Sequence, residues 1–559
     1  MFSARLYLFW AQNVAFLLIF FDGAASNSVK VTIKNGPIVG EQRSNHIAFE
    51  GIPYAKPPLG SLRFAPSELL DERWNEPRNT TQTGPVCLQW SHLKPGDDKI
   101  DGEEDCLFLN VYTPSLTPSD DPFPTIVHLH GGAFMYGGGG FFRPDFLLQR
   151  PLIFVTVNYR LGPLGFLSTE DDVVGGNFGL KDQVTALQWV QKNIKYFGGD
   201  AGRVTLSGFS AGGASVHLHM LSPLSRGLFR SAIDHSGSAF NPWVMVERSA
   251  EKANLIASGL GCPTNNSRAL VECLRQRPAR EIVRQVAKLQ DFLYNPFSPL
   301  GVVVEKHGKN NPQPFLAEHP RELTRRGKFN KVPLILSVTE AEGLYPAAEF
   351  FGNASYLEHI NKRWNDVLPS ILDYKYAVRD VHSRDALSDV IRMRYLGKEN
   401  LHEHNFHHFV RMVSNRLFFA GITELAKLMQ PHISVYFYLD RYKTTYGLSE
   451  ALSGSAKFLG VPHGEDILLI LPSSLRKDAP YTVEELTMAS KFVDMYESFA
   501  YGQQPRFGKQ LLAAQKDAER ISYLDIGFPN SSIVTADFLS DEPFWGILNF
   551  NDGTTVPSA

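Results

Sequence analysis

The sequence predicts an α/β fold in which a large, mostly parallel central sheet is flanked by helices. Two kinds of segment lead to this prediction. Runs such as "PTIVHLH" and "LIFVTVNY" are short, β-branched and almost continuously apolar, as strands buried on both faces must be. Helix-like runs alternate with them: "LKDQVTALQWVQKNIKYFGG" places its apolar side chains, from Leu180 to Val190, on one helical stripe that ends at the glycine pair 198–199.

The same alternation continues along the rest of the chain. "VTLSG" is a further buried strand that runs into a turn at Ser210, and a helix is expected from Ala211. "VPLILSV" and "ISVYFYLD" are later strand candidates, and a capping box from Thr482 to Glu485 begins a late helix. Because no repeat or long linker separates two such units, we expect one domain over residues 27–559.

The first 26 residues, "MFSARLYLFWAQNVAFLLIFFDGAAS", are predicted to be a signal peptide. Arg5 precedes an apolar run, and small residues up to Ser26 provide a cleavage site. The run is short for a membrane span and is interrupted by Gln12 and Asn13. No later segment is apolar enough to span, so we expect a secreted, extracellular protein whose mature chain has no membrane span.

The four cysteines fall as two close pairs, Cys87 with Cys106 and Cys262 with Cys273. Three pairings of four cysteines are possible, and two short surface loops are the simplest arrangement in an oxidising compartment. Acceptor triplets for N-linked glycosylation agree with export; they begin at Asn79, Asn265, Asn353 and Asn530.

Ser210 stands between Gly208 and Gly212 in "GFSAG", directly after a predicted strand. A strand that turns sharply into a helix exposes such a serine, and the two glycines remove Cβ atoms that would clash in the turn. The helix from Ala211 points unsatisfied N–H groups at the serine. Ser210 is therefore predicted to be a nucleophile.

A nucleophilic serine needs oxyanion donors, a base and an acid. "VHLHGGAFMYGGGG" follows a buried strand, and the N–H groups of Gly131 and Gly132 are candidates for an oxyanion hole together with that of Ala211. Among seventeen histidines, His463 in "LGVPHGEDI" follows all the strands named above, as the base does in the chain order nucleophile, acid, base. "LILSVTEAEGLY" offers two carboxylates after a strand, Glu340 and Glu342; we choose Glu342, which precedes a glycine.

These motifs resemble the type-B carboxylesterase family of the α/β-hydrolase superfamily. "FGGDAGRVTLSGFSAGG" matches the serine signature of that family, and "EDCLFLNVYTP" matches its second signature. "FEGIPYAKPPLGSLRF" near the N-terminus reads as family sequence too, so the resemblance covers nearly the whole mature chain. It implies an α/β-hydrolase fold, a catalytic domain over residues 27–559, and hydrolysis of carboxylic esters.

The resemblance also implies roles for individual residues. Ser210 is then the nucleophile, Glu342 the acid and His463 the base, with Gly131, Gly132 and Ala211 as the oxyanion hole. It implies the disulfides Cys87–Cys106 and Cys262–Cys273, and two structural ion pairs, Arg63 with Glu104 and Arg160 with Asp182. By the same resemblance, Ser236 corresponds to a residue that supports the catalytic histidine from behind, and Trp243 to a residue of the acyl pocket.

Departures from the family pattern narrow the substrate. Cholinesterases carry a glutamate before the serine and a tryptophan late in the first cysteine loop, which attract a quaternary ammonium. Here Phe209 precedes the serine, and Trp90 lies only three residues after Cys87. Phe209 also departs from the glutamine usual in juvenile-hormone esterases. An apolar Phe209 favours neutral esters, because an unpaired charge beside it is costly.

Other functions were weighed against this one. A formal net charge of -3 gives no reason to expect a nucleic-acid partner. "LHEHNFHHF" is not the His-Glu-x-x-His zinc motif, because Phe406 stands where its second histidine should be. We therefore expect a solvated helix there, with His404 and His408 on one face, and no metal or cofactor. Three alternatives stay open: a juvenile-hormone-type esterase, a stoichiometric scavenger of esters or organophosphates, and a metal-dependent hydrolase. The oligomeric state, monomer or homodimer, is not predicted.

Overall fold

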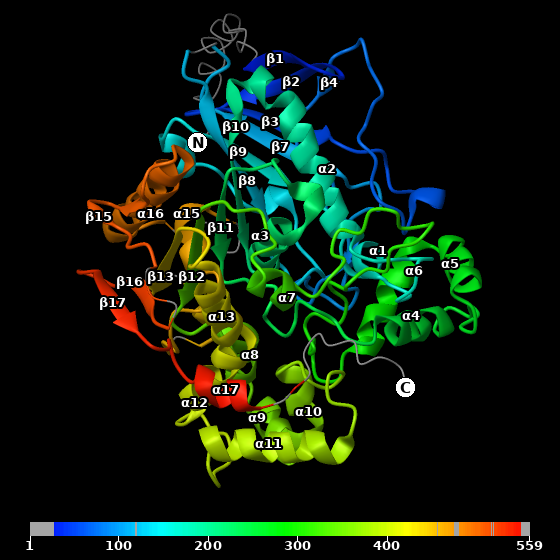
Figure 1. Ribbon diagram of the computed structural model, residues 1–559, viewed down its shortest axis with the longest axis vertical. Helices are drawn as coiled ribbons and strands as arrows, with labels where there is room; N and C mark the ends of the chain where they lie inside the picture. Colours follow the sequence, from blue (N-terminus) through cyan, green and yellow to red (C-terminus); the bar gives the residue numbers. More distant parts are fainter. Residues whose placement is uncertain are drawn as a thin grey trace, which may run out of the picture.

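The computed structural model describes residues 27–550 except 118–119, 446, 456, 474–479, 516, 518 and 549, so the predicted signal peptide lies outside the described residues. A 13-stranded sheet runs through the described part of the chain (Figure 1). In sheet order its strands are β1 (Ser28–Ile33), β2 (Gly36–Gln42), β3 (Ile47–Pro53), β7 (Phe108–Thr113), β9 (Ile153–Val157), β8 (Phe123–Leu129), β10 (Gly199–Phe209), β11 (Ser231–His235), β12 (Leu334–Thr339), β13 (Val435–Asp440), β16 (Ile521–Ile526) and β17 (Ser532–Ala536), with β4 (Arg78–Asn79) beside β2. Two small hairpin sheets join β5 (Gln89–Trp90) to β6 (Ile100–Asp101) and β14 (Arg506–Phe507) to β15 (Gln510–Leu511).

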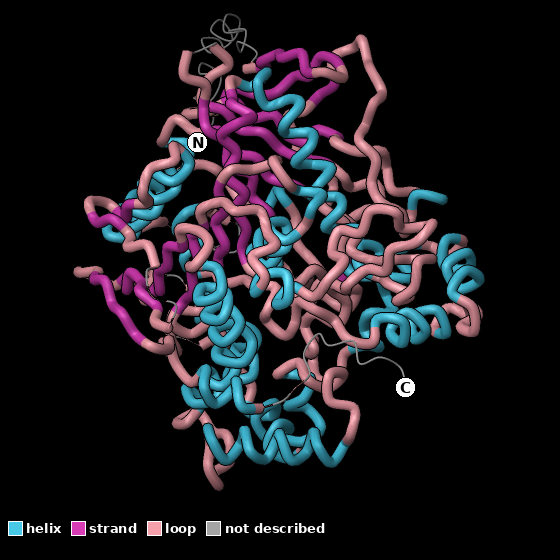
Figure 2. Tube along the Cα trace, in the orientation of Figure 1, coloured by secondary structure: helices cyan, strands magenta, loops and turns pink. Residues whose placement is uncertain are grey.

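The middle of the sheet is parallel from β9 to β16, and its outer strands are antiparallel. Parallel strands need helical crossovers, which cover both faces of the sheet. Successive side chains on one strand therefore enter two different cores: Val127 and Leu129 of β8 belong to one cluster of buried residues, and Ile126 to the other. The predicted large, mostly parallel sheet flanked by helices is thus confirmed, as Figure 2 shows.

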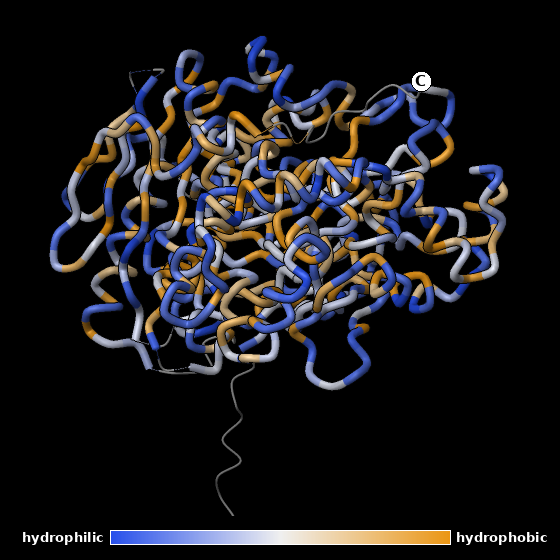
Figure 3. Tube along the Cα trace, turned by 90° about the horizontal axis from the view of Figure 1, so that it is seen from below, coloured by the Kyte–Doolittle hydropathy of each residue, from blue (hydrophilic) through white to orange (hydrophobic). Residues whose placement is uncertain are grey.

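The two faces of the sheet carry different helices. The helix α3 (Ala211–Leu221) packs on β8, β10 and β11, whereas α16 (Val483–Ala500) packs on β8 and β10 from the face of the other core. The remaining helices are α1 (Gly162–Phe166), α2 (Phe178–Asn193), α4 (Ser249–Ser258), α5 (Ser267–Arg275), α6 (Ala279–Arg284), α7 (Pro320–Arg325), α8 (Leu344–Phe351), α9 (Ala354–Lys362), α10 (Trp364–Ile371), α11 (Val381–Tyr395), α12 (Phe406–Ser414), α13 (Ala420–Met429), α14 (Leu448–Ser453), α15 (Glu465–Ile470) and α17 (Glu542–Ile547). Figure 3 shows apolar positions gathered in the middle of the molecule, with hydrophilic positions on many of its outer turns.

The apolar runs singled out in the sequence form β8, β9, β10, β12 and β13. The predicted capping box is present at the start of α16, where the hydroxyl of Thr482 and the carboxylate of Glu485 each accept a backbone N–H. The helix α2 ends at Asn193 and is followed by a 3-10 turn; Gly198, with a φ of 83°, ends that turn, whereas Gly199 already belongs to β10. The strand β11 escaped prediction because its sequence, "SAIDH", interrupts the apolar run with polar side chains.

Two disulfides close short loops, one between Cys87 and Cys106 and the other between Cys262 and Cys273. Four asparagines predicted to carry glycans have exposed side chains at Asn79, Asn265, Asn353 and Asn530. Within the part of the chain that the structure describes, none of the helices combines the length and the apolar character needed to cross a bilayer.

Candidate active site

Ser210 lies at the turn from β10 to α3, with its backbone at φ 59° and ψ −119°. A non-glycine residue in this region is strained, and such strain is typical of functional sites. The flanking glycines explain how the turn closes: a Cβ atom on Gly208 would lie 2.1 Å from the carbonyl oxygen of Gly212, and one on Gly212 would lie 2.0 Å from that of Leu129. The Ser210 N–H donates to the carbonyl of His235 on β11, which holds the turn against the sheet.

Glu342 and His463 are hydrogen-bonded to each other at 2.5 Å, between Nδ1 of the imidazole and Oε2 of the carboxylate. Glu342 has a side chain with no exposed surface, and its Oε1 accepts two further bonds, from the Ser236 hydroxyl at 2.6 Å and from the Thr339 N–H at 2.7 Å. The other candidate acid, Glu340, is exposed and faces Arg441 at 4.0 Å. A buried carboxylate that accepts three hydrogen bonds can hold the imidazole in one orientation.

The loop of His463 lies against the residue that precedes the serine. The imidazole is 4.7 Å from the Phe209 ring, measured between ring centroids, and a Cβ atom on Gly464 would lie 2.6 Å from that ring. Ala341 donates its N–H to the carbonyl of Val461, so the turn that carries Glu342 is joined directly to the turn that carries His463. The Ser210 hydroxyl itself makes no hydrogen bond to His463 or to any other described residue; such bonds often tighten only when substrate is bound.

The glycine loop after β8 passes directly over the serine. A Cβ atom on Gly131 would lie 3.0 Å from the Cβ of Ser210, and Gly132 has a φ of 105° and no room for a side chain. Among the described residues, no acceptor is found for the backbone N–H groups of Gly131, Gly132 or Ala211. Gly131 and Ala211 are buried and Gly132 is half-buried. Because buried N–H groups are usually satisfied, these donors are suited to bind an external oxygen.

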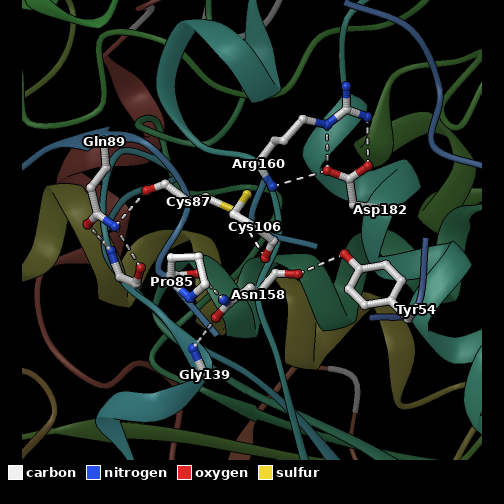
Figure 4. Close-up of a disulfide and its surroundings, with 10 residues drawn as sticks. Tyr54, Pro85, Cys87, Gln89, Cys106, Gly139, Asn158, Arg160 and Asp182 are labelled. Carbon is white, nitrogen blue, oxygen red and sulfur yellow. Dashed lines mark hydrogen bonds and ion pairs between the residues drawn. A yellow bond between two sulfur atoms is a disulfide. The ribbon is translucent and has the colours of Figure 1, made fainter. Parts of the chain in front are cut away.

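This loop is fixed from behind by the first disulfide loop (Figure 4). The side-chain amide of Gln89, two residues after Cys87, donates to the carbonyl of Gly137 and accepts the N–H of the same glycine. Asn158 accepts the N–H of Gly139 and donates to Pro85. These bonds hold the glycine-rich loop through its backbone groups.

Aromatic rings enclose the imidazole of His463. Phe418 lies at 4.6 Å and Tyr345 at 5.8 Å between ring centroids, in addition to Phe209. Trp243 lies behind Phe418 at 6.1 Å and donates its indole N–H to Leu417 in the π-helix Asn415–Phe419. Sequence reasoning pointed to Phe209 and Trp243 but missed Tyr345 and Phe418. Tyr345 follows the acid by three residues, which is a usable signal, whereas nothing in the sequence near Phe418 links it to the site.

The two ion pairs that the family resemblance implies are present. Arg63 binds Glu104 through two hydrogen bonds of 2.5 and 2.7 Å. Arg160 binds Asp182 through two of 2.7 and 2.6 Å, next to the first disulfide (Figure 4).

The histidine-rich segment differs from its prediction. The helix α12 begins only at Phe406, so His404 lies before it in a turn and does not share a helical face with His408. His404 is 3.7 Å from the exposed Glu399. No group of side chains suited to holding a metal ion occurs among the described residues.

A profile of the carboxylesterase family matches residues 27–542. Venom carboxylesterase-6 of Apis mellifera is 37% identical over 536 residues, which cover 94% of this chain and 95% of that protein. A carboxylic ester hydrolase of Bombus ignitus is 37% identical over 90% of each chain, and esterase FE4 of Myzus persicae is 40% identical over 77% of this chain and 76% of its own. The solved structure of juvenile hormone esterase from Manduca sexta, with OTFP covalently attached, superposes with a TM-score of 0.79 at 26% identity, covering 94% of this chain and 98% of that one.

Proposed function

This chain belongs to the carboxylesterase family and is a carboxylic ester hydrolase with an α/β-hydrolase fold, and from that premise we propose that it is a secreted enzyme that cleaves neutral esters through an acyl-enzyme on Ser210. The observation that carries the assignment of the residues is the bond between Glu342 and His463, 2.5 Å long, beside the strained turn of Ser210. The acid, the base and the nucleophile reach this place from three separate loops.

In the first half of the reaction, the Ser210 hydroxyl attacks the ester carbonyl and its proton passes to Nε2 of His463. Glu342 holds the imidazole with its Nδ1 proton directed at the carboxylate and stabilises the imidazolium that forms. The carbonyl oxygen becomes an oxyanion, which accepts the N–H groups of Gly131, Gly132 and Ala211; one such donor stabilises a transition state by ~3 kcal/mol.

The tetrahedral intermediate then collapses and the alcohol leaves with the proton of His463. In the second half, His463 removes a proton from water, the hydroxide attacks the acyl-enzyme, and the oxyanion forms again in the same place. Collapse releases the carboxylic acid and returns the proton to Ser210. The reaction needs no cofactor, because every proton moves between substrate, water and these side chains.

The walls of the site support uncharged substrates. The rings within 6 Å of His463 are Phe209, Phe418 and Tyr345. None of them carries a charge, so a cationic alcohol would lose its hydration without a partner. An ester with apolar acyl or alcohol groups would instead bury apolar surface against the rings, at ~25 cal/mol for each Å².

A juvenile-hormone-type esterase is the second candidate for the substrate class. The similarity to the solved juvenile hormone esterase over 94% of this chain favours it, whereas Phe209 departs from the glutamine usual before the serine of such enzymes. Turnover of short-chain, long-chain, hormone-like and choline esters by the purified protein distinguishes these classes. A scavenger would release one product per active site and then stop.

Secretion is part of the proposal. The predicted signal peptide at residues 1–26 and the disulfides Cys87–Cys106 and Cys262–Cys273 support it, since disulfides persist mainly in oxidising compartments. Secretion is tested by expressing the full chain and sequencing the N-terminus of the protein recovered from the medium.

The nucleophile is tested with Ser210→Ala and a serine-directed phosphonate. We expect the substitution to lower kcat by ~10⁶-fold, and the phosphonate to add its mass to the wild-type peptide that contains Ser210 and to no peptide of the variant. A variant that keeps most of the ester hydrolysis, after separation from contaminating esterases, would refute the assignment.

A further inference from the structure

A second hydrogen-bonded group lies beneath the site, on the sheet face covered by α16. Side chains of four adjacent strands, β10 to β13, point to this face. His235 is in register with Ser337 and Ser337 with Tyr438, whereas Ser207 of β10 pairs with Ile233, two residues before His235. Asp466 of α15 and Tyr496 of α16 complete the group. We name it the polar belt; it consists of six residues, each with 0% of its surface exposed: Ser207, His235, Ser337, Tyr438, Asp466 and Tyr496.

Asp466 is the charged centre of the polar belt. Its Oδ2 accepts the Tyr438 hydroxyl at 2.8 Å and lies 3.3 Å from Nδ1 of His235 and 3.4 Å from the Ser337 hydroxyl. Its Oδ1 accepts the N–H of Ile467 at 2.9 Å. Burial raises the pKa of Asp466, but the hydrogen bonds and charge of His235, with the Tyr438 bond, outweigh burial and leave that pKa below its ordinary value.

His235 uses both ring nitrogens within the belt. Nδ1 lies 2.8 Å from the Tyr438 hydroxyl, and Nε2 lies 2.6 Å from the Tyr496 hydroxyl. The Tyr496 hydroxyl in turn lies 3.4 Å from that of Ser207. The imidazole stacks on the Tyr496 ring with 12° between the planes, so it cannot turn without breaking bonds to β13 and α16 together.

Two members of the belt, Asp466 and His235, are joined to residues of the proposed triad. Asp466 follows His463 by three residues. His235 accepts the N–H of Ser210 with its own carbonyl, and the next residue, Ser236, donates to Glu342. The belt therefore fixes the three loops of the triad relative to one another from below the sheet.

The His463 loop is held at several points along the chain. Before His463, the carbonyl of Val461 accepts the Ala341 N–H; after it, Asp466 is buried in the belt. Between them, Gly464 has a φ of 88° and lies so close to the Phe209 ring that a Cβ atom would not fit. The imidazole therefore has little freedom to move toward the strand. Asp466 also sits at the start of α15, where a negative charge is favourable.

We propose that Asp466, held by the Tyr438 hydroxyl and beside Nδ1 of His235, is a positioning residue that sets the distance between the imidazole of His463 and the Ser210 hydroxyl. This inference rests on the proposed function of the triad. Because misplacement of a reacting group by 1 Å can cost ~10²-fold in rate, a positioning role predicts a loss in kcat with little change in KM. A purely structural role predicts fewer folded molecules, each with normal kcat.

The test is Asp466→Asn, compared with wild type and with His219→Gln. His219 is a matched control, because its buried imidazole also binds two side chains, Ser225 at 2.6 Å and Gln183 at 2.9 Å, but belongs to neither the triad nor the belt. For each protein the active sites are counted with the phosphonate, and kcat per labelled site, KM for a neutral ester and the rate of labelling are measured.

We expect Asp466→Asn to lower kcat per labelled site and the labelling rate together, by ~10- to 100-fold, with KM within about threefold of wild type. His219→Gln should lower thermal stability but keep kcat per labelled site. If Asp466→Asn does not fold, Tyr438→Phe removes the shortest side-chain bond to Asp466 and should lower kcat per site by ~3- to 10-fold.

Normal kcat per labelled site in the folded variant would overturn the positioning role. A failure of the proposed function is distinguishable, because wild-type protein would then not be labelled at Ser210 at all.

Discussion

The substitution Glu342→Gln distinguishes the roles of the two carboxylates that follow β12, Glu340 and Glu342. The carboxylate of Glu342 accepts three bonds, from His463 at 2.5 Å, Ser236 at 2.6 Å and the Thr339 N–H at 2.7 Å. A glutamine of the same shape offers one acceptor oxygen and an NH₂ group that only donates. Either the imidazole or the Ser236–Thr339 side must then face a donor.

The backbone N–H of Thr339 cannot rotate, so the glutamine oxygen should remain toward Thr339 and Ser236, and its NH₂ should face Nδ1 of His463. The imidazole then carries its proton on Nε2, where it cannot accept the proton of Ser210. A wrong tautomer in a serine hydrolase of this type lowers kcat by about 10⁴-fold, equivalent to about 5 kcal/mol in the barrier.

The assay is the release of alcohol from a neutral ester, expressed per active site. Glu340→Gln is the matched control, because Glu340 lies two residues away with an exposed side chain 4.0 Å from Arg441. We expect it to keep kcat within about twofold, since exposed ion pairs contribute little. The reasoning would be refuted if Glu342→Gln kept more than about a tenth of wild-type kcat, or if the control lost activity instead.

Three further predictions follow from the geometry. Gly132→Ala places a methyl group 1.9 Å from the carbonyl oxygen of Tyr136, at a residue whose φ is 105°. The clash should displace the proposed oxyanion donors and lower kcat by at least ~10²-fold in steady-state assays. A folded variant with unchanged kcat would contradict the oxyanion role. Burial lowers the pKa of His219 to about 3, so as the pH falls the unfolded chain binds a proton at this histidine before the folded protein does. The contribution of His219 to the free energy of unfolding is therefore complete above pH ~6.5 and decreases below it by ~1.4 kcal/mol per pH unit. In urea unfolding of His219→Gln, the free energy of unfolding should fall with decreasing pH by that much less per pH unit than in wild type. Replacing Cys262 and Cys273 together by serine opens a loop with a sequence separation of 11 and should cost ~3 kcal/mol in unfolding free energy, measured by thermal denaturation, while kcat stays near wild type.

Much of the fold and the core of the proposed site can be predicted from local sequence. β8, β10 and β12 are predicted from their nearly continuous apolar runs, because only a strand covered on both faces needs such residues. The turn of Ser210 is read from Gly208 and Gly212, since the missing Cβ atoms are a steric requirement of the turn itself.

Other features were invisible at that level because they depend on pairing between distant segments. The contacts of Glu342 are one: the glycine after it was the reason to choose it over Glu340, but its hydrogen bonds to Ser236 and His463 depend on how the turn after the strand packs. Phe418 is another, because the π-helix brings it to the imidazole from a segment with no chemical signature.

The sequence by itself determined where the chain extends, where it turns and which serine lies at the turn from strand to helix, because apolar periodicity and glycine sterics act over a few residues. Only the tertiary structure brought the carboxylate of Glu342 to His463 and placed a second carboxylate, Asp466, beneath the site. Hydrogen bonds between segments more than 100 residues apart depend on the packing of the whole sheet, and no local pattern encodes them.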